Sequence, residues 1–224
     1  MPIKKIEIFG DSILRGAVCD NSGRLKLRRD SSYSYLSGMG YEVRNNARIG
    51  STIVKGTEML NRHIDECGSD TLVILGFGGN DCNFDWKDVS DRSDENHDPK
   101  VSLDYFADLY RKAIAYIKSR RAAVAVCNLV PLDSEKFLNW ISREGSESSI
   151  LHWLGDRSML YRWHENYNRM VESIARETGC LLINIRESFL TRHDYKRLMG
   201  PDGIHPTEEG YSIIDSVMKE CLQS

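Results

Sequence analysis

The amino-acid sequence predicts an α/β fold in which a parallel β-sheet carries helices on both faces. Short apolar runs alternate with longer amphipathic segments along the chain, which is the pattern of repeated strand–helix units. Residues 71–77 are the clearest strand because the run is almost entirely apolar, as expected for a parallel strand buried on both faces. No repeat, low-complexity tract or linker interrupts the 224 residues. A single domain over residues 1–224 is therefore expected.

Five apolar runs are predicted to be the strands of this sheet. They are residues 3–9, 41–46, 71–77, 122–130 and 181–185. Gly10 ends the first run at a turn, and Pro131 ends the fourth because proline cannot donate a hydrogen bond to a neighbouring strand. Ser12 therefore lies just past the carboxyl end of the first strand. In open α/β sheets this is the edge at which ligands bind.

Four longer segments between and after these runs are predicted to be helices. They are residues 51–67, 102–120, 161–178 and a last helix with Pro206 in its first position. Apolar residues keep the helical period through 102–120, and Gly179 is a typical helix end. Proline is favoured at the first helical position because its missing N–H is not needed there. Residues 18–27 depart from the alternation and are expected to form a hairpin.

Two connections are longer than a minimal fold of this class needs. Residues 84–100 are polar and acidic and lack the spacing of a calcium-binding loop, so they are expected to be a solvated loop on the active-site side rather than a metal site. Trp86 is the exception in that loop, and it is expected either to line a pocket or to anchor the loop. Residues 132–160 are expected to be a lid-like insertion that can carry short helices.

The composition argues against several classes of function. The 30 Lys and Arg and the 33 Asp and Glu give a net charge of −3, which offers no electrostatic basis for binding nucleic acid or a membrane surface. No run approaches the roughly 18 apolar residues that would span a bilayer. The first residues lead into a strand without an apolar leader segment, so a cytoplasmic location is expected.

The six cysteines do not indicate a zinc or thioredoxin-like site, because none are paired as Cys-x-x-Cys. Cys82 directly follows a glycine-rich loop motif. It is expected to be a packing residue, although the sequence leaves its reactivity open.

Polar side chains suited to acyl transfer follow several of the predicted strands. Such a reaction needs a hydroxyl nucleophile, a base, a group that orients the base, and donors for the oxyanion. Ser12 follows the first strand, and Asp202 and His205 come after the fifth. Asp202 and His205 are close enough in sequence to sit side by side across one turn. His205 is then suited to take the Ser12 proton, because the ordinary pKa of histidine is about 6.5.

An oxyanion donor is predicted after the third strand. Asn80 has a nonionisable amide that can donate to a developing negative charge. Gly78 and Gly79 precede it and allow the backbone to approach a ligand closely.

Taken in order, these short motifs resemble those of the SGNH, or GDSL-type, hydrolase family. The matching residues are Gly10-Asp11-Ser12, Gly50, Gly78-Gly79-Asn80-Asp81 and Asp202-Gly203-Ile204-His205-Pro206. They extend over nearly the whole chain. The resemblance implies a flavodoxin-like, three-layer α/β/α fold with five parallel strands. The Gly-x-Ser-x-Gly elbow of the α/β-hydrolases is absent around Ser12.

The resemblance also implies roles for individual residues. Ser12 would be the nucleophile, His205 the base and Asp202 its partner. The oxyanion hole would consist of the backbone N–H groups of Ser12 and Gly50 with the side chain of Asn80. No metal or organic cofactor is implied. The candidates for substrate contact are Asp11, Asp81 and Trp86, and Asp11 is also expected to hold the turn before Ser12.

The expected function is hydrolysis of carboxylic esters through an acyl-enzyme on Ser12. The first choice is a short-chain esterase or a carbohydrate O-deacetylase, with a small-molecule or carbohydrate ester as its partner. A lipase, lysophospholipase or acyl-thioesterase with the same triad is the alternative, because Phe137, Trp140 and Trp153 are suited to an apolar site. A flavodoxin-like binding protein without catalysis is the alternative of another class, although the Ser12, His205, Asp202 and Asn80 set argues against it. The oligomeric state is left open.

Overall fold

A five-stranded parallel sheet forms the centre of the molecule, with the strand order β4-β1-β5-β6-β7. The computed structural model describes residues 2–223. The strands are β1 (Lys5–Gly10), β4 (Glu42–Asn45), β5 (Thr71–Gly76), β6 (Ala123–Cys127) and β7 (Leu181–Ile183). Gly10 is in register with Gly76 at the ends of β1 and β5, so the loops after these strands begin side by side. The predicted parallel α/β fold is confirmed.

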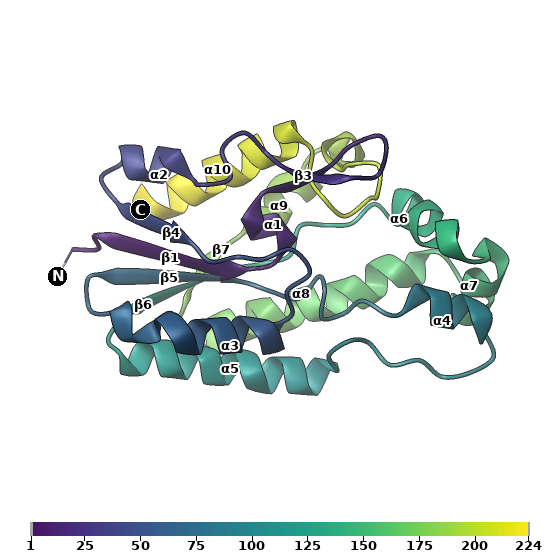
Figure 1. The fold of residues 1–224 in the computed structure, drawn as a ribbon, viewed down its shortest axis with the longest axis horizontal. Helices are drawn as coiled ribbons and strands as arrows, with labels where there is room; N and C mark the ends of the chain where they lie inside the picture. The colour runs from purple at the N-terminus through teal and green to yellow at the C-terminus, as the bar shows by residue number, and fades with distance from the viewer. Residues whose placement is uncertain (1, 224) are drawn as a thin grey trace.

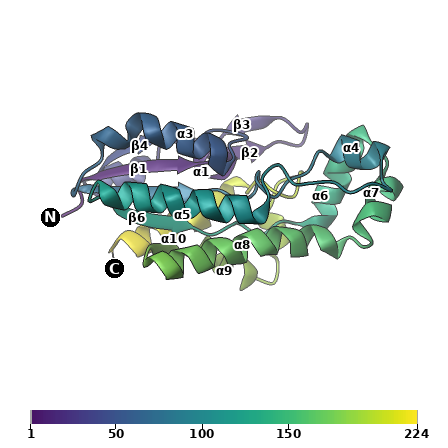
Figure 2. The same ribbon diagram turned by 90° about the horizontal axis from the view of Figure 1, so that it is seen from below.

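Helices cover both faces of the sheet, as the views of Figures 1 and 2 show. One face carries α3 (Ile53–His63), α5 (Leu103–Ser119) and α8 (Ser158–Thr178). The other carries α2 (Ser34–Gly38), α9 (Ile185–Leu190) and α10 (Glu208–Gln223). Three short 3-10 helices, η1 (Ile64–Glu66), η2 (Ser142–Glu144) and η3 (Tyr195–Leu198), lie in the connections. Together the helices and the sheet form three layers.

Two apolar cores follow from the alternation of side chains along the strands. Val73 and Leu75 pack in the core beneath α3, α5 and α8. Leu72 and Ile74, their neighbours in β5, pack in the core beneath α2, α9 and α10. Successive residues of a strand point to opposite faces, so an almost entirely apolar strand is what a sheet with two covered faces requires.

A third apolar core lies beyond the carboxyl ends of the strands, in a region that we call the cap. The cap consists of residues 84–100 and 132–160, and it contains α4 (Trp86–Asp91), α6 (Ser134–Ile141) and α7 (Glu147–Leu154). Figure 1 shows these helices side by side at the end of the molecule opposite the chain termini. Val89, Leu138 and Ile150 are fully buried among them. The N–H of Ser146 donates to Ser90 Oγ over 2.7 Å, which joins the two segments.

The prediction of a solvated loop over residues 84–100 is therefore wrong for residues 86–91, which form α4. Asp85 accepts a hydrogen bond from the Asp88 N–H at 3.1 Å and caps α4. The helix buries Val89 against residues that are distant in the sequence, and such a contact leaves no local pattern. Within residues 2–223, no group of three or more His, Cys, Asp or Glu side chains is placed to hold a metal ion.

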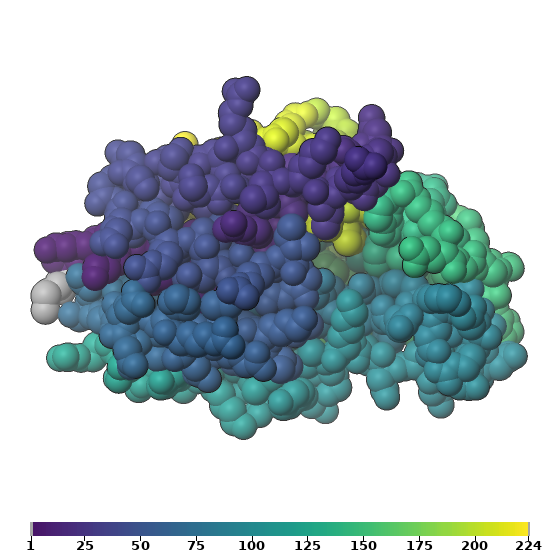
Figure 3. All heavy atoms as spheres, viewed as in Figure 1, coloured from purple at the N-terminus to yellow at the C-terminus, as the bar shows by residue number. Residues whose placement is uncertain are grey.

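The hairpin predicted for residues 18–27 is present as the antiparallel strands β2 (Ala17–Cys19) and β3 (Leu25–Leu27). Gly23 at its turn lies so close to Trp140 of α6 that an added Cβ would be 2.8 Å from the ring. The hairpin thus contacts the cap. In the space-filling view the hairpin (purple) lies next to residues 132–160 of the cap (green), and residues of the C-terminal part (yellow) are visible between them (Figure 3).

Several predicted boundaries differ from the structure by a few residues; the fifth strand, for example, ends at Ile183 because Ile185 begins α9. The last helix begins at Glu208 rather than at Pro206, because Pro206 pairs with Met199 in an isolated antiparallel bridge. Thr207 then caps the helix, since its Oγ1 accepts from the Gly210 N–H at 3.2 Å. β6 ends at Cys127, before Pro131, and the apolar residues that follow line a pocket. In residues 2–223 no helix has both the length and the apolar character needed to cross a membrane.

Candidate active site

A tight turn places Ser12 at the carboxyl edge of the sheet. β1 ends at Gly10, where an added Cβ would be 2.7 Å from the carbonyl oxygen of Gly76, so only glycine fits between the two strands. The N–H of Ile13 donates to Asp11 Oδ1 over 2.9 Å. Asp11 therefore caps α1 (Ser12–Arg15), as aspartate commonly does at a helix start, and Ser12 is the first residue of that helix.

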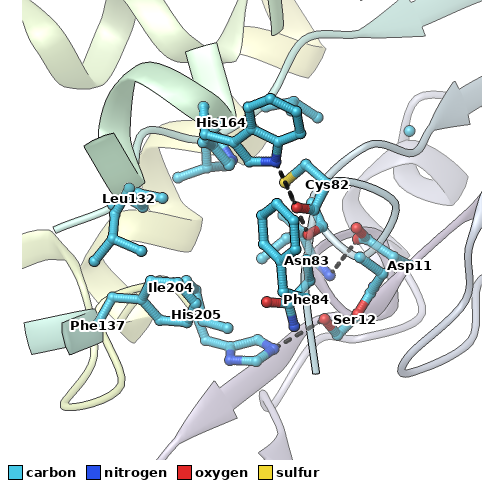
Figure 4. A pocket seen from close by; sticks show the side chains of 18 of the residues that line it. Asp11, Ser12, Cys82, Asn83, Phe84, Leu132, Phe137, His164, Ile204 and His205 are labelled. Atoms are coloured by element: carbon cyan, nitrogen blue, oxygen red, sulfur yellow. Dashed lines mark hydrogen bonds between the residues drawn. The ribbon is translucent and has the colours of Figure 1, made fainter. Parts of the chain in front are cut away.

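The structure brings Ser12, His205 and Asp202 together in one hydrogen-bonded series. His205 Nε2 lies 2.9 Å from Ser12 Oγ, and His205 Nδ1 lies 2.6 Å from Asp202 Oδ2. All three residues are at least nine-tenths buried. Figure 4 shows the contact between His205 and Ser12 as a dashed line at the edge of a pocket. A hydroxyl, an imidazole and a carboxylate in this order are the parts of a serine nucleophile with its base.

The hydrogen bonds around Asp202 keep its carboxyl group ionised. Burial by itself disfavours the charged form. The hydrogen bond and charge of His205, together with the backbone N–H groups of His205 and Ile204, outweigh burial and lower the pKa of Asp202 below its ordinary value. These two N–H groups lie 3.1 and 3.2 Å from Asp202 Oδ1. An ionised Asp202 can hold the imidazole in one orientation and stabilise its protonated form.

The turn that carries Asp202 and His205 is tied to the cap. The N–H of Asp133, just before α6, donates to the Gly203 carbonyl oxygen over 2.8 Å. Gly203 has a φ of 74°, which only glycine adopts freely. An added Cβ there would lie 2.5 Å from the Asp133 carbonyl oxygen and 2.6 Å from the Phe137 nitrogen. The turn that carries Asp202 and His205 and the start of α6 therefore fit closely against each other.

Besides Ser12, two residues are predicted oxyanion donors, Asn80 and Gly50. Within residues 2–223, Asn80 borders the pocket and Gly50 does not. Asn80 lines it, and its Nδ2 donates to the carbonyl oxygen of Ser51 over 3.2 Å, which leaves a second amide hydrogen available. Gly50 has a φ of 74° and is exposed. Among the residues that the structure describes, those lining the pocket do not include Gly50. The oxyanion role of both residues stays a prediction.

The three candidates for substrate contact have different surroundings. Asp11 and Trp86 line the pocket. Asp81 is fully buried, and within residues 2–223 it is absent from the pocket wall. Its Oδ1 accepts from the Ile53 N–H at 2.8 Å, so Asp81 holds the first residue of α3. We therefore assign Asp81 to the support of this helix instead of to substrate contact.

Asp11 and Asp81 are both harder to ionise than ordinary aspartates. Burial raises the pKa of Asp11 to about 6, although its hydrogen bond from Ile13 and the charge of His205 act in the opposite direction. Burial also raises the pKa of Asp81 to about 7, and the nearby charge of Asp11 adds to this effect. Two buried carboxylates close to each other disfavour simultaneous ionisation.

The pocket beside Ser12 has a volume of about 250 Å³ and a mainly apolar wall. Figure 4 shows Leu132, Phe137 and Ile204 on the side of His205, and Phe84 next to Ser12. Cap residues supply much of the wall, including Phe84, Trp86, Leu132, Phe137, Trp153 and Leu154. Phe84 and Trp153 pack edge to face, with ring centroids 4.9 Å apart. The apolar character of 132–160 was the signal in the sequence for such a site.

Sequence reasoning did not assign several polar residues of this wall to the site, among them Cys82, Asn83, Asn128 and His164. Cys82 lines the pocket, and its Sγ lies 3.3 Å from the Gly79 carbonyl oxygen. Burial raises the pKa of the Cys82 thiol, so the thiol stays protonated and unreactive, as a packing residue should. His164 of α8 also lines the pocket, and no motif in the sequence marks it.

Comparison with known proteins agrees with this geometry. No curated protein sequence matches the chain. Among solved structures, a lipase/acylhydrolase from Enterococcus faecalis superposes with a TM-score of 0.67 at 18% identity, covering 99% of this chain and 96% of that one. A mutant of an acetyl-xylooligosaccharide esterase from a Geobacillus species has a TM-score of 0.67 at 17% identity, covering 100% and 96%. A GDSL-like lipase from Bacteroides thetaiotaomicron has a TM-score of 0.61 at 16% identity, covering 98% and 88%.

These structural matches, all below a fifth in sequence identity, establish the fold. The family follows from the sequence itself, because the profile of the GDSL-like lipase/acylhydrolase family matches residues 8–213. That range contains Ser12, Asp202 and His205, and it includes both segments of the cap. The resemblance found in the short motifs is thus confirmed, and the chain belongs to the GDSL-like lipase/acylhydrolase family of ester hydrolases.

Proposed function

We propose that the chain hydrolyses esters or thioesters of an apolar acyl group, with Ser12 as the nucleophile and the acyl group in the pocket beside it. The observation that carries this proposal is the continuity of the site. Ser12 and His205 line the same cavity as Phe84, Leu132 and Phe137. An acyl chain attached to Ser12 Oγ would therefore extend over an apolar wall.

The contacts of the triad support a two-step reaction. Ser12 Oγ attacks the carbonyl carbon of the ester, and its proton passes to His205 Nε2, which lies 2.9 Å away. His205 then gives this proton to the leaving oxygen or sulfur atom as its bond to the carbonyl carbon breaks, which releases an alcohol or a thiol. Water next attacks the acyl-enzyme, with His205 taking its proton and returning it to Ser12 Oγ. Asp202 stabilises the imidazolium in both steps.

Developing charge on the carbonyl oxygen needs donors that are already in place. The second amide hydrogen of Asn80 is suited to this role, because the first is held by the Ser51 carbonyl oxygen. The backbone N–H of Ser12, at the start of α1, is the other donor that we propose.

The wall of the pocket favours an apolar acyl group over a sugar. An apolar cavity of about 150 Å³ is enough to hold benzene, so a cavity of about 250 Å³ accommodates a longer group than acetyl. Sugars are bound through several polar contacts at fixed positions, whereas this wall consists mainly of aliphatic and aromatic side chains. We therefore favour the lipase or thioesterase alternative over the short-chain esterase and the deacetylase.

The experiment is a series of p-nitrophenyl esters from acetate to hexadecanoate, measured with the wild type and with Ser12→Ala. We expect kcat/KM to rise by up to about fourfold per added methylene, the value for burying one such group, until the pocket is filled. Ser12→Ala should lose both turnover and labelling by a fluorophosphonate. A maximum at acetate would favour the short-chain or deacetylase alternative, and a wild type that neither reacts nor is labelled would refute the proposal.

A further inference from the structure

One histidine of the pocket wall has no role in the proposed reaction. His164 lies on α8 and is 7% exposed. It lines the same cavity as Ser12 and His205, and Figure 4 shows it on the α8 side, apart from both of them. Burial, with a further contribution from the positive charge of Arg186, lowers the pKa of His164 to about 3. The imidazole is therefore neutral at physiological pH.

His164 makes no hydrogen bond with any residue in the described part of the chain, and its Nδ1 is fully buried. Buried polar atoms are normally paired, so each exception needs an explanation. Other polar groups of the wall have partners. Asn128 Nδ2 donates to Asn184 Oδ1 over 2.7 Å, and Trp163 Nε1 donates to the Cys82 carbonyl oxygen over 2.8 Å. The two nitrogens of His97 lie 3.1 Å from an Asp88 carboxylate oxygen and 2.9 Å from the Arg92 carbonyl oxygen, both of which are acceptors.

The surroundings of His164 make a purely structural role a poor explanation. A leucine or phenylalanine at this position would satisfy an apolar wall without leaving a polar ring unpaired. Because Nδ1 has no accessible surface, the neutral imidazole can meet a group in this mainly apolar cavity only through Nε2, which is an N–H donor in one tautomer and a lone pair in the other. It can therefore recognise one polar group at a defined distance from Ser12.

We propose that His164 is the polar subsite of the acyl pocket and that the preferred substrates are esters or thioesters of hydroxyacyl groups. This proposal rests on the function proposed above. A hydroxyl can donate to the lone pair of the imidazole or accept from its N–H, so it matches either tautomer. A keto oxygen matches only the N–H. A carboxylate would remain charged in an apolar cavity opposite a neutral partner, which is costly.

The experiment compares p-nitrophenyl decanoate with its positional hydroxydecanoate isomers. For wild type, we expect one isomer, or two adjacent ones, to have a higher kcat/KM than decanoate. In His164→Leu the ratio of kcat/KM for that isomer to kcat/KM for decanoate should fall by about tenfold, the usual effect of losing one hydrogen bond to the bound ligand. His164→Gln, which keeps a donor and an acceptor, should restore part of the ratio.

Met159→Leu is the matched control, because Met159 lines the same pocket and this change alters its shape but not its polarity. The ratio should stay at the wild-type value in this variant. A wild type that hydrolyses decanoate but prefers no hydroxylated isomer would overturn the subsite while leaving the proposed function intact, and this result needs no variant to fold. An unchanged ratio in His164→Leu would also overturn it. If the wild type hydrolyses no ester of any length, the proposed function itself fails.

Discussion

Each polar residue at the edge of the sheet is held by a specific partner. Asp11 caps the helix that begins with Ser12, Asp202 is held by the backbone N–H groups of its own turn, and Asn80 is held by Ser51. Groups that are already fixed need no reorganisation when charge develops, which is the main source of electrostatic catalysis. We therefore expect that truncating one of these polar side chains lowers kcat.

Asn80→Ala should lower kcat by about 10² to 10³ and change KM little, because the amide is proposed to stabilise charge that exists only in the transition state. The measurement is steady-state hydrolysis of the best p-nitrophenyl ester, with thermal unfolding to show that the fold is retained. Asn83→Ala is the control, since Asn83 lines the same pocket and its side-chain oxygen accepts from Trp86 Nε1. An unchanged kcat in Asn80→Ala would remove Asn80 from the oxyanion hole.

At the scale of elements, helices are positioned by side chains from distant loops. Thr52 is at the N-cap of α3 but makes no side-chain capping bond, and Asp81, from the loop after β5, accepts from the Ile53 N–H in its place. Asp81 thus links the loop that carries Asn80 to α3, the helix that follows Gly50. This hydrogen bond explains why the buried carboxyl of Asp81 is present away from the pocket wall.

Asp81→Asn should make stability less dependent on pH. The pKa of Asp81 is raised to about 7 in the folded protein, so the folded state binds the proton more tightly than the unfolded chain. Its stabilising effect is complete below about pH 4 and is lost as pH rises through about 7. Asn keeps an oxygen for the Ile53 N–H and cannot ionise. From pH 5 to pH 8, the free energy of unfolding of the wild type should therefore fall by ~1 kcal/mol or more relative to that of Asp81→Asn.

The measurement is urea unfolding of both proteins at pH 5 and at pH 8. Asp81→Ala serves as the control because it also cannot ionise but lacks the capping oxygen, so it should be about 0.5–2 kcal/mol less stable than Asp81→Asn at both pH values. Equal pH dependence in the wild type and in Asp81→Asn would mean that Asp81 ionises normally in the folded protein.

Gly203→Ala should impair both stability and turnover. The Cβ would approach Asp133 and Phe137 within 2.6 Å or less, and the φ of 74° would add strain of about 1–3 kcal/mol. The turn that holds Asp202 and His205 has to move away from Asp133 and Phe137 to make room for this Cβ. Both kcat and the melting temperature should therefore fall.

Gly179→Ala separates the two effects, because its φ is 63° but nothing lies within 4 Å of the added Cβ. This control should lose stability without losing kcat. If both variants lose stability and neither loses kcat, the contact between the catalytic turn and α6 does not position His205.

At the scale of the whole molecule, a family fold is combined with a cap that has its own apolar core. The cap lies beyond the carboxyl ends of the strands (Figure 1), and its residues form part of the wall of the pocket that Ser12 and His205 line (Figure 4). In the proposed function, the turns at the edge of the sheet carry out the chemistry and the cap selects the acyl group. Such a division predicts that damage to the cap changes the preferred acyl length more than the reaction itself.

Trp153→Ala should lower kcat/KM for decanoate by about tenfold or more relative to acetate, since a large apolar surface of the pocket wall is lost. Trp153 contacts Phe84, Trp86 and His97 through its ring. The measurement is the ester series used above. The ratio of kcat/KM for decanoate to kcat/KM for acetate is compared between the wild type and the variant.

Trp140→Ala is the matched control for this prediction. Trp140 packs against the core of the cap, but among the described residues it is not part of the pocket wall. Its variant should lose stability and keep the acyl preference. The same loss of preference in both variants would indicate that the cap acts as a whole and not through the wall at Trp153.

The sequence by itself determined the parallel sheet and the meeting of Ser12, Asp202 and His205 at one edge. The sheet follows from local patterns, because an apolar run of strand length and a glycine turn are visible in a few neighbouring residues. The site follows from short motifs, because Ser12 comes directly after the carboxyl end of a strand and Asp202 is only three residues from His205. Only the tertiary structure decided that residues 84–100 fold back onto 132–160, that Asp81 supports α3, and that His164 lies unpaired in the pocket. These features depend on contacts between segments far apart in the chain, and such contacts leave no periodic trace in either segment.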